Sequence, residues 1–161
     1  MKLNLVLDLD NTLIDARPKI NSPGFVIKKR PGLDEFMKFA FNHCDTVSVW
    51  SAGMKGYVNA ALKHILTPKQ YMSLKFIHTR RQCTNLNNMY VKNLRHIFIT
   101  QPRFNQTNTL LIDDRREHKM FHPKNIYTIP AFEGQLYDRE LTKLKNKILR
   151  SSTIAQINSV T

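Results

Sequence analysis

Two carboxylates, Asp8 and Asp10, stand two residues apart near the start of the chain, directly after a short apolar run. This run, from Leu3 to Leu7, is too short to cross a membrane and has no helical stripe, so we predict a strand that is buried on both faces. Carboxylates at the end of a buried strand are costly unless a cation or a proton pairs with them. The pair is therefore a candidate for metal or acid–base chemistry, and a surface Asx turn is the alternative interpretation.

A second pair of carboxylates, Asp113 and Asp114, follows another short apolar run at 109–112. Because parallel strands place their carboxyl ends at the same edge of a sheet, we expect the two acidic pairs to lie together. Such a cluster forms a hard, oxygen-only site suited to Mg²⁺. The sequence leaves open whether Asp113 or Asp114 touches the metal directly.

A turn of small residues, Ser51, Ala52 and Gly53, lies between a predicted strand at 45–50 and a helical pattern that ends at Ile65. A strand, a small-residue turn and a helix together present backbone N–H groups and a hydroxyl to an anion. We therefore predict an anion site at Ser51 and Ala52. An ordinary helix cap is the alternative interpretation of Ser51.

The elements that must position these residues alternate between strand and helix patterns, which is typical of an α/β domain. We predict one domain over 1–150, with a central, mostly parallel sheet, helices on both faces and small hairpin inserts, but no large cap domain. A polar, frayed tail is expected at 151–161. The other predicted segments are an irregular hairpin at 15–29, helices at 33–43 and 137–150, strands at 74–77 and 125–129, and a small hairpin within 78–90, whereas 96–100 fits either a helix or a strand.

Composition places limits on the class of protein. Two cysteines far apart in a chain of 161 residues argue against a disulfide framework and against a zinc site. With no long apolar run and no room for a removable signal peptide, we expect a soluble, intracellular monomer without a membrane partner, acting in the nucleus, in the cytoplasm or, as a viral protein, in an infected cell. The formal net charge of +13 favours anionic partners such as phosphate esters, acidic peptides or nucleic acid.

The string LDLDNTL resembles the first motif, DxDx[TV], of the haloacid dehalogenase superfamily, whose members are mostly phosphatases. Four further strings occur in the order KRPGLDEF, VSVWSAG, NNMYVKNL and TLLIDD. Together they resemble the NLI-interacting-factor-like phosphatases, which include the small C-terminal-domain phosphatases. The resemblance runs from about Leu3 to Phe132 and implies a Rossmann-like haloacid dehalogenase core.

The resemblance also implies an activity. It is the Mg²⁺-dependent hydrolysis of phosphoserine and phosphothreonine in proteins, typically in the repeated tail of RNA polymerase II. Asp8 would attack phosphorus to give an aspartyl-phosphate, and Asp10 would act as the acid and then as the base. Thr12 would orient Asp10. The metal would be held by Asp8, by the backbone carbonyl of Asp10 and by Asp113 or Asp114.

The remaining predicted site residues would bind the substrate phosphate. Ser51 and Ala52 would hold the phosphoryl oxygens, and Lys92 of the NNMYVKNL string would add a fixed positive charge. Ser51 stands where the family usually has threonine. The hydroxyl group is kept, because serine also carries one. Arg80 lies where the family has an arginine before a cysteine, here Cys83, and would touch the phosphate side. A solvated surface position is the alternative interpretation of Lys92 and Arg80.

Two further functions are compatible with these residues. The net charge of +13 and an open site would suit a phosphatase of nucleic-acid ends or nucleotides, with nucleic acid as the partner of the basic surface. A non-catalytic binding module that keeps the fold is the third possibility. Every position of the motif is filled, however, which favours an active enzyme.

Overall fold

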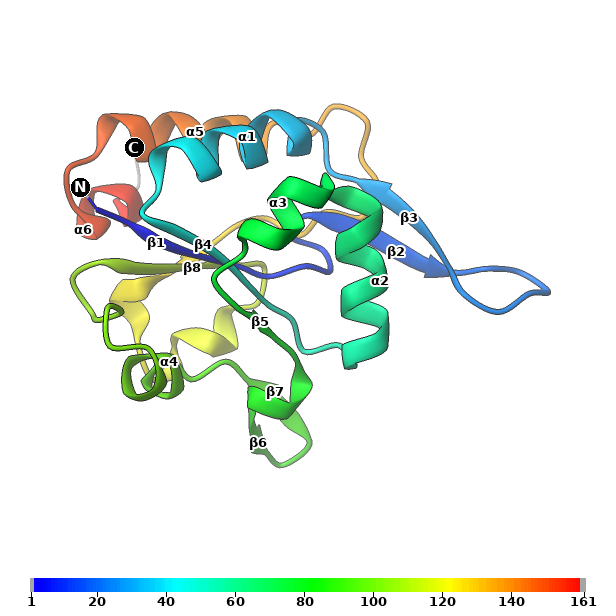
Figure 1. The fold of residues 1–161 in the computed structure, drawn as a ribbon, viewed down its shortest axis with the longest axis horizontal. Coiled ribbons are helices and arrows are strands. Elements are labelled where there is room, and N and C mark those ends of the chain that lie inside the picture. Colours follow the sequence, from blue (N-terminus) through cyan, green and yellow to red (C-terminus); the bar gives the residue numbers. More distant parts are fainter. Residues whose placement is uncertain (1, 160–161) are drawn as a thin grey trace.

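The computed structural model describes residues 2–159 and is centred on a sheet of five parallel strands (Figure 1). β1 (Asn4–Leu7) is the central strand, and all four of its residues are buried. Its neighbours are β4 (Thr46–Trp50) and β8 (Thr109–Asp113), which pair with it in parallel so that all three strands end at the same edge. β5 (Ile77–His78) and β9 (Ile126–Thr128) complete the order β5-β4-β1-β8-β9.

Helices cover both faces of this sheet. Within residues 2–159 they are α1 (Leu33–His43), α2 (Lys55–Ile65), α3 (Pro68–Ser73), α4 (Arg95–Thr100), α5 (Glu140–Arg150) and α6 (Ile154–Asn158). Leu5 and Leu7 of β1 face the larger core cluster with α1, α2, α5 and α6, whereas Val6 faces a smaller cluster with α4. Figure 1 shows α1 and α5 side by side over one face and α4 on the other. In this part of the chain no helix has both the length and the apolar character needed to cross a bilayer.

The helices form where apolar residues recur at helical spacing. In α1 the buried residues include Leu33, Phe36 and Ala40, and Asp34 lies in the first turn, where a negative charge is favourable. The residue before α1 is Gly32, whose φ of 81° lies in the left-handed region that favours glycine. The predicted helix at 33–43 therefore has its start fixed by backbone chemistry as well as by packing.

Two antiparallel hairpins project from this core. β2 (Ile14–Pro18) and β3 (Phe25–Lys29) form the first, which extends away from the sheet in Figure 1. β6 (Thr84–Leu86) and β7 (Met89–Val91) form the second, as predicted within 78–90. Both are short, so they leave the carboxyl edge of the sheet without a large cap within residues 2–159.

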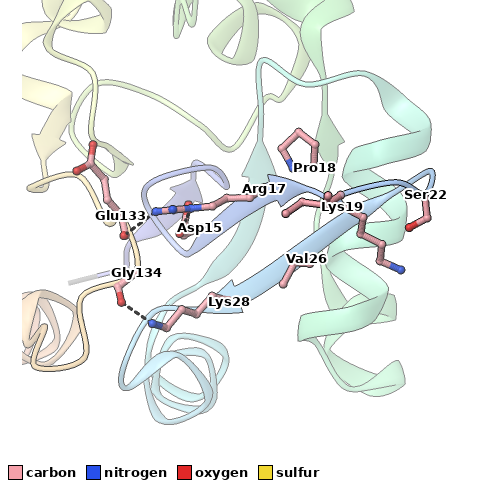
Figure 2. Close-up of a pocket in the computed structure, with 10 residues that line it drawn as sticks. Asp15, Arg17, Pro18, Lys19, Ser22, Val26, Lys28, Glu133 and Gly134 are labelled. Carbon is pink, nitrogen blue, oxygen red and sulfur yellow. Dashed lines mark hydrogen bonds and ion pairs between the residues drawn. The ribbon is translucent and has the colours of Figure 1, made fainter.

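The two faces of the β2–β3 hairpin differ in chemistry. Phe25 contacts the ring of Tyr57 on α2, with ring centroids 4.8 Å apart. Figure 2 shows the opposite face, where Arg17 donates to the carbonyl of Glu133 at 3.1 Å and Lys28 donates to that of Gly134. These contacts border a cavity of about 800 Å³. They tie the base of the hairpin to the segment that precedes α5.

Two segments differ from the sequence prediction. No helix was predicted after the one that ends at Ile65, but α3 forms there, and Thr67 caps it by accepting a hydrogen bond from the backbone N–H of Gln70. The frayed tail expected from residue 151 is also wrong for 154–158, because α6 forms there and buries Ile154 and Ile157 against the core. Residues 160–161 of the predicted tail lie outside the described residues. Residues 96–100, left open between helix and strand, belong to α4.

Candidate active site

Asp8 follows β1 directly and lies at the carboxyl edge of the sheet, 6% exposed. Its backbone N–H donates to the carbonyl of Ile112 at 2.9 Å, which continues the pairing of β1 with β8. Thr12 donates its hydroxyl to Asp8 Oδ2 at 2.8 Å, and Lys92 donates to Asp8 Oδ1. Both oxygens of this carboxylate are thus held in place by side chains.

Lys92, directly after β7, is the cation of the site and is 2% exposed. Its ammonium also donates to Asp113 Oδ2 at 2.5 Å. Burial alone would lower the pKa of Lys92, but the carboxylates of Asp113 and Asp8 raise it above its usual value. The ammonium therefore stays charged, and it is a buried group rather than a solvated surface lysine.

The acidic pair after β8 lies beside Asp8, as predicted. Carboxylate oxygens of Asp8, Asp113 and Asp114 lie within 4.8 Å of one another. Asp113 has both oxygens engaged, one by Lys92 and one by the backbone N–H of Arg115 at 2.9 Å. Within residues 2–159 no hydrogen bond engages the carboxylate of Asp114, whose pKa is raised to about 6 by burial and by its two acidic neighbours.

This group fits a divalent cation on charge and on donor chemistry. Of the three carboxylates, Asp8 and Asp113 pair with the ammonium of Lys92 and Asp114 does not, so negative charge remains in excess. Burial and the neighbouring Asp113 raise the pKa of Asp8. The folded chain therefore disfavours the state in which all three carboxylates are ionised. An oxygen-coordinated ion such as Mg²⁺ would compensate the excess charge.

Asp10 lies two residues further on and is held by Tyr57 of α2, whose hydroxyl donates to Asp10 Oδ1. Burial raises the pKa of Asp10, and the Tyr57 hydrogen bond opposes that rise. A carboxyl group with a raised pKa can hold and release a proton near neutral pH. The expectation that Thr12 orients Asp10 is wrong in this structure, because the Thr12 hydroxyl bonds to Asp8 and Tyr57 takes that place.

The predicted anion site forms the neighbouring end of β4. Ser51 is buried, and its Oγ accepts a hydrogen bond from the N–H of Gly53 at 2.9 Å. A Cβ on Gly53 would lie 3.0 Å from Tyr57 and 3.1 Å from Ser51 Oγ, so a side chain there would fit only if these neighbours shifted by a few tenths of an ångström. Arg80 donates to the carbonyl of Ala52 at 2.8 Å. Arg80 thus lies beside this turn, where it supports the backbone.

The structure therefore brings the predicted residues together at one edge of the sheet in two groups. Because β4 and β1 are adjacent and parallel, the turn after β4 lies next to the acidic residues after β1. The acidic group with its neighbours consists of Asp8, Asp10, Thr12, Lys92, Asp113 and Asp114, and the group at the turn after β4 consists of Ser51, Ala52 and Arg80.

Two residues of the site were missed by sequence reasoning. Tyr57 was assigned only to the apolar face of its helix, and nothing in the sequence indicated that its hydroxyl reaches Asp10. His118, 1% exposed, accepts from the backbone N–H of Lys92 through Nδ1 at 3.1 Å. Its Nε2 lies 3.3 Å from Asp113 Oδ2, without forming a hydrogen bond of good geometry.

Comparisons with known proteins agree with this arrangement. The sequence profile of the NLI interacting factor-like phosphatases matches residues 3–160. A CTD phosphatase-like protein of Invertebrate iridescent virus 6 is 27% identical over 91% of this chain and 97% of its own length. A ubiquitin-like domain-containing CTD phosphatase of Arabidopsis thaliana is 28% identical over 97% of this chain and 48% of its own length. The chain thus spans nearly all of the viral relative and about half of the plant one.

A solved structure confirms the predicted fold class. The fission yeast RNA polymerase II CTD phosphatase Fcp1, bound to beryllium fluoride, superimposes with a TM-score of 0.63. The sequences are 20% identical, and the match covers 85% of this chain and 43% of that chain.

Proposed function

The chain belongs to the NLI interacting factor-like phosphatase family, and we propose that it is a Mg²⁺-dependent phosphatase of phosphoserine and phosphothreonine in proteins. The match confirms the predicted enzyme class, a phosphatase of the haloacid dehalogenase type. Relatives described as CTD phosphatases support a phosphoprotein partner, with the repeated tail of RNA polymerase II as the reference substrate. The catalytic unit in this proposal is one domain over residues 1–150.

The observation that carries the proposal is the sharing of one buried ammonium, that of Lys92, by two buried carboxylates, Asp8 and Asp113. Burying so many charges in one place is unfavourable unless the geometry and further partners compensate for it. Groups of this kind cluster at catalytic sites, where perturbed proton affinities serve the reaction. The arrangement matches what hydrolysis of a phosphate ester needs, which is a nucleophile, an acid and a fixed positive charge.

For Mg²⁺ we propose Asp8, Asp114 and the backbone carbonyl of Asp10 as the ligands on the protein. Asp114 is favoured over Asp113 because its oxygens have no donor within residues 2–159, whereas those of Asp113 are engaged by Lys92 and by a backbone N–H. Bound Mg²⁺ would neutralise negative charge on the phosphoryl group. Asp113 would act through Lys92, which it holds in place.

In the proposed reaction an oxygen of Asp8 attacks phosphorus and forms an aspartyl-phosphate. Protonated Asp10 gives its proton to the serine or threonine oxygen as the bond between that oxygen and phosphorus breaks. Asp10, now ionised, then takes a proton from water, and the resulting hydroxide oxygen attacks phosphorus and releases Asp8 and inorganic phosphate. Lys92 keeps Asp8 ionised and oriented throughout.

We propose that the phosphoryl oxygens lie against the turn after β4. The Ser51 hydroxyl and the Ala52 N–H are the donors in this proposal, with the ammonium of Lys92 as the charge. Arg80 acts through the carbonyl of Ala52, to which it donates, so its loss would change the shape of the turn. In this proposal Arg80 does not contact the phosphate itself, in contrast to the role that the family resemblance implies.

The test is the hydrolysis of a phosphoserine heptad peptide, with Mg²⁺ and with EDTA, by the native chain and by Asp8→Asn. Turnover should require both Mg²⁺ and Asp8. Asp45→Asn serves as the matched control, since it makes the same change at an exposed position and should keep full activity. Peptide hydrolysis that survives in Asp8→Asn would contradict the mechanism.

A phosphatase of nucleic-acid ends is the second candidate, and the net charge of +13 is the observation that favours it. A 3′-phosphorylated oligonucleotide is therefore assayed beside the peptide. Turnover of the oligonucleotide alone would replace the protein substrate with a nucleic acid and leave the chemistry of Asp8 and Asp10 as proposed.

A further inference from the structure

Two cavities lie along α5, and the first of them begins at Asp114 of the acidic cluster. One, of about 700 Å³, lies between Asp114 and Lys147 and is bordered by Arg116 and Lys119. The other, of about 630 Å³, continues from Lys147 to Arg150. The two cavities adjoin at Lys147, which lines both, and we call them together the α5 groove.

The α5 groove is strongly basic. Lys143, Lys147 and Arg150 recur at helical spacing along one side of α5, and this stretch is about 10 Å long at 1.5 Å per residue. Two further cations, Arg116 and Lys119, line its other end. Among its lining residues the only carboxylate is Asp114, which the proposed metal would compensate.

In the part of the chain that the structure describes, most of these cations form no ion pair with a carboxylate. Lys143 pairs with Glu140 at 2.6 Å, and Lys147 donates to the carbonyl of Ser159 at 3.0 Å. Within residues 2–159, no carboxylate forms an ion pair with Lys147 or Arg150. By contrast, the cavity beside the β2–β3 hairpin contains two carboxylates, and one of them pairs with Arg17. The α5 groove is thus the cavity with the greater surplus of positive charge.

The composition of the groove favours an acidic peptide over single-stranded nucleic acid. Nucleic-acid grooves combine cations with aromatic rings on which successive bases stack. The single aromatic residue that lines the α5 groove is Tyr127, and the ammonium of Lys147 lies over its ring, 5.6 Å from the centroid. A chain that carries separate phosphate or carboxylate groups needs no stacking surface and matches the spaced cations.

We propose that the α5 groove docks a second phosphorylated residue of the same polypeptide whose phosphoserine occupies the active site. This inference rests on the proposed function and adds a preference for multiply phosphorylated substrates. Asp114 belongs to both the acidic cluster and the groove, so the groove opens at the place where the reacting residue is bound. Part of the excess positive charge of the chain therefore serves to hold substrate.

The test compares a peptide with one phosphoserine to the same peptide with a second, roughly six residues away on either side, a reach of about 20 Å. For the native chain, the doubly phosphorylated peptide should have the lower KM. Lys147→Gln combined with Arg150→Gln should raise that KM roughly tenfold and leave kcat unchanged. The same variant should hydrolyse the singly phosphorylated peptide and para-nitrophenyl phosphate as the native chain does.

The matched control is Lys69→Gln combined with Lys75→Gln, which removes two exposed charges elsewhere. An equal rise of KM in both double variants would show a general effect of net charge and would overturn the docking site. Because Lys147 contacts Ser159, thermal unfolding is measured for each variant. Lys119→Gln with Arg150→Gln is the alternative if the first double variant is unstable.

Docking can also be measured without turnover, as binding of the fluorescent doubly phosphorylated peptide to Asp8→Asn. Groove-dependent binding, together with an absence of peptide turnover by the native chain, would refute the proposed function and keep the docking site. Turnover of the peptide by the native chain, with no effect of the groove variant on KM or binding, would refute the docking site and keep the proposed function. Displacement of the peptide by a single-stranded RNA that binds more tightly would overturn the assignment to a peptide.

Discussion

The two oxygens of Asp8 have different partners, a neutral hydroxyl from Thr12 and an ammonium from Lys92. The sequence indicated that these residues belong to one site, because each lies in a recognisable motif. It did not indicate which donor meets which acceptor. Thr12 was assigned to Asp10, and the correct partner follows only from the turn after β1, where Asn11 adopts φ 60°. Such pairings depend on backbone angles within one turn, which residue types alone do not determine.

Tyr57→Phe tests the role of the hydroxyl that holds Asp10. The hydrogen bond favours the ionised carboxylate and so lowers the pKa of Asp10 against the larger effect of burial. Without it, Asp10 should keep its proton to higher pH. Since Asp10 must be protonated to act as the acid, the alkaline limb of kcat/KM against pH should move to higher pH.

The measurement is a pH profile of kcat/KM with a phosphopeptide. Tyr71→Phe on α3 is the matched control and should leave the profile unchanged. A shift of the alkaline limb to lower pH in Tyr57→Phe would show that Asp10 is not the acid.

His118→Phe tests the buried imidazole ring that lies against both Lys92 and Asp113. Burial, together with the positive charges of Lys92 and Arg115, lowers the pKa of His118 to about 3, so the ring is neutral at pH 7 and Nδ1 can accept from the Lys92 N–H. Phenylalanine leaves that N–H without a partner, which should lower the free energy of unfolding by about 1–3 kcal/mol. The misplaced Lys92 should also lower kcat by roughly tenfold or more.

Rescue separates this role from simple packing. His118→Asn keeps an acceptor near the position of Nδ1 and should retain kcat within about threefold of the native value, because the hydrogen bond to Lys92 is kept. Equal losses of kcat in the asparagine and phenylalanine variants would show that the shape of the ring, and not the hydrogen bond, supports the site.

At the scale of elements, one buried arginine joins the site to the start of α5. Arg30 is 1% exposed and donates through Nε and Nη2 to both oxygens of Asp138, at 2.8 and 2.7 Å. Nη1 donates to the carbonyl of Thr12 at 3.0 Å, within the turn that carries Asp8 and Asp10. The KRP string of the sequence thus has a structural role, since Arg30 fixes the catalytic turn against the segment that leads into α5.

Arg30→Met should destabilise the fold strongly. The substitution leaves Asp138 with the Glu140 N–H but without its cation, and it removes the Arg30 donors from the carbonyls of Thr12 and Pro130. Breaking a buried pair of this kind costs about 3–5 kcal/mol. Urea unfolding should show the loss as a lower midpoint with an unchanged slope. Lys29→Met, at the exposed pair with Asp34, should cost less than about 1 kcal/mol. A similar cost for the two variants would contradict a special role for Arg30.

The elements that sequence patterns predicted correctly are those with an unambiguous pattern of burial. β1 is a short run whose four residues are all buried, and α1 and α5 present apolar residues at helical spacing. α1 forms as expected, and α5 begins at Glu140, three residues after the predicted start. α3 and α6 were missed because each is only five or six residues long, with too few turns for a period to show. Both have the same local signal, a capping box of threonine followed by glutamine three residues later, which could have revealed them.

At the scale of the whole molecule, the order of the strands brings the site together. β1 lies between β4 and β8, so residues about one hundred positions apart in the chain, such as Asp8 and Asp113, end at the same edge. The rule that ligand sites lie at the carboxyl ends of parallel strands made this predictable from the sequence. The long-range hydrogen-bond partners were not predictable, because the donor Tyr57 and the acceptor His118 reach the site from elements whose position depends on how the whole sheet is covered.

This convergence of carboxylates predicts that Mg²⁺ and folding are coupled. The raised pKa of Asp114, about 6, means that the folded chain binds its proton more tightly than the unfolded chain does. Ionised Asp114 therefore weakens the fold at pH 7, and this penalty is absent below the ordinary pKa of an aspartate and grows as pH rises through 6. Without metal, Asp114→Asn should thus unfold at a higher temperature than the native chain.

With Mg²⁺ present, the native chain should instead unfold at a higher temperature than Asp114→Asn. At about one hundred times its dissociation constant, a ligand that binds only the folded chain adds about 2.7 kcal/mol, or roughly 5–10 °C for a chain of this size. The native chain should show this rise, and Asp114→Asn should not, because it lacks the proposed direct ligand. Asp45→Asn, exposed and remote, should respond as the native chain does. If Asp114→Asn gained as much as the native chain, or if Asp113→Asn alone lost the response, the metal would be held by Asp113 instead.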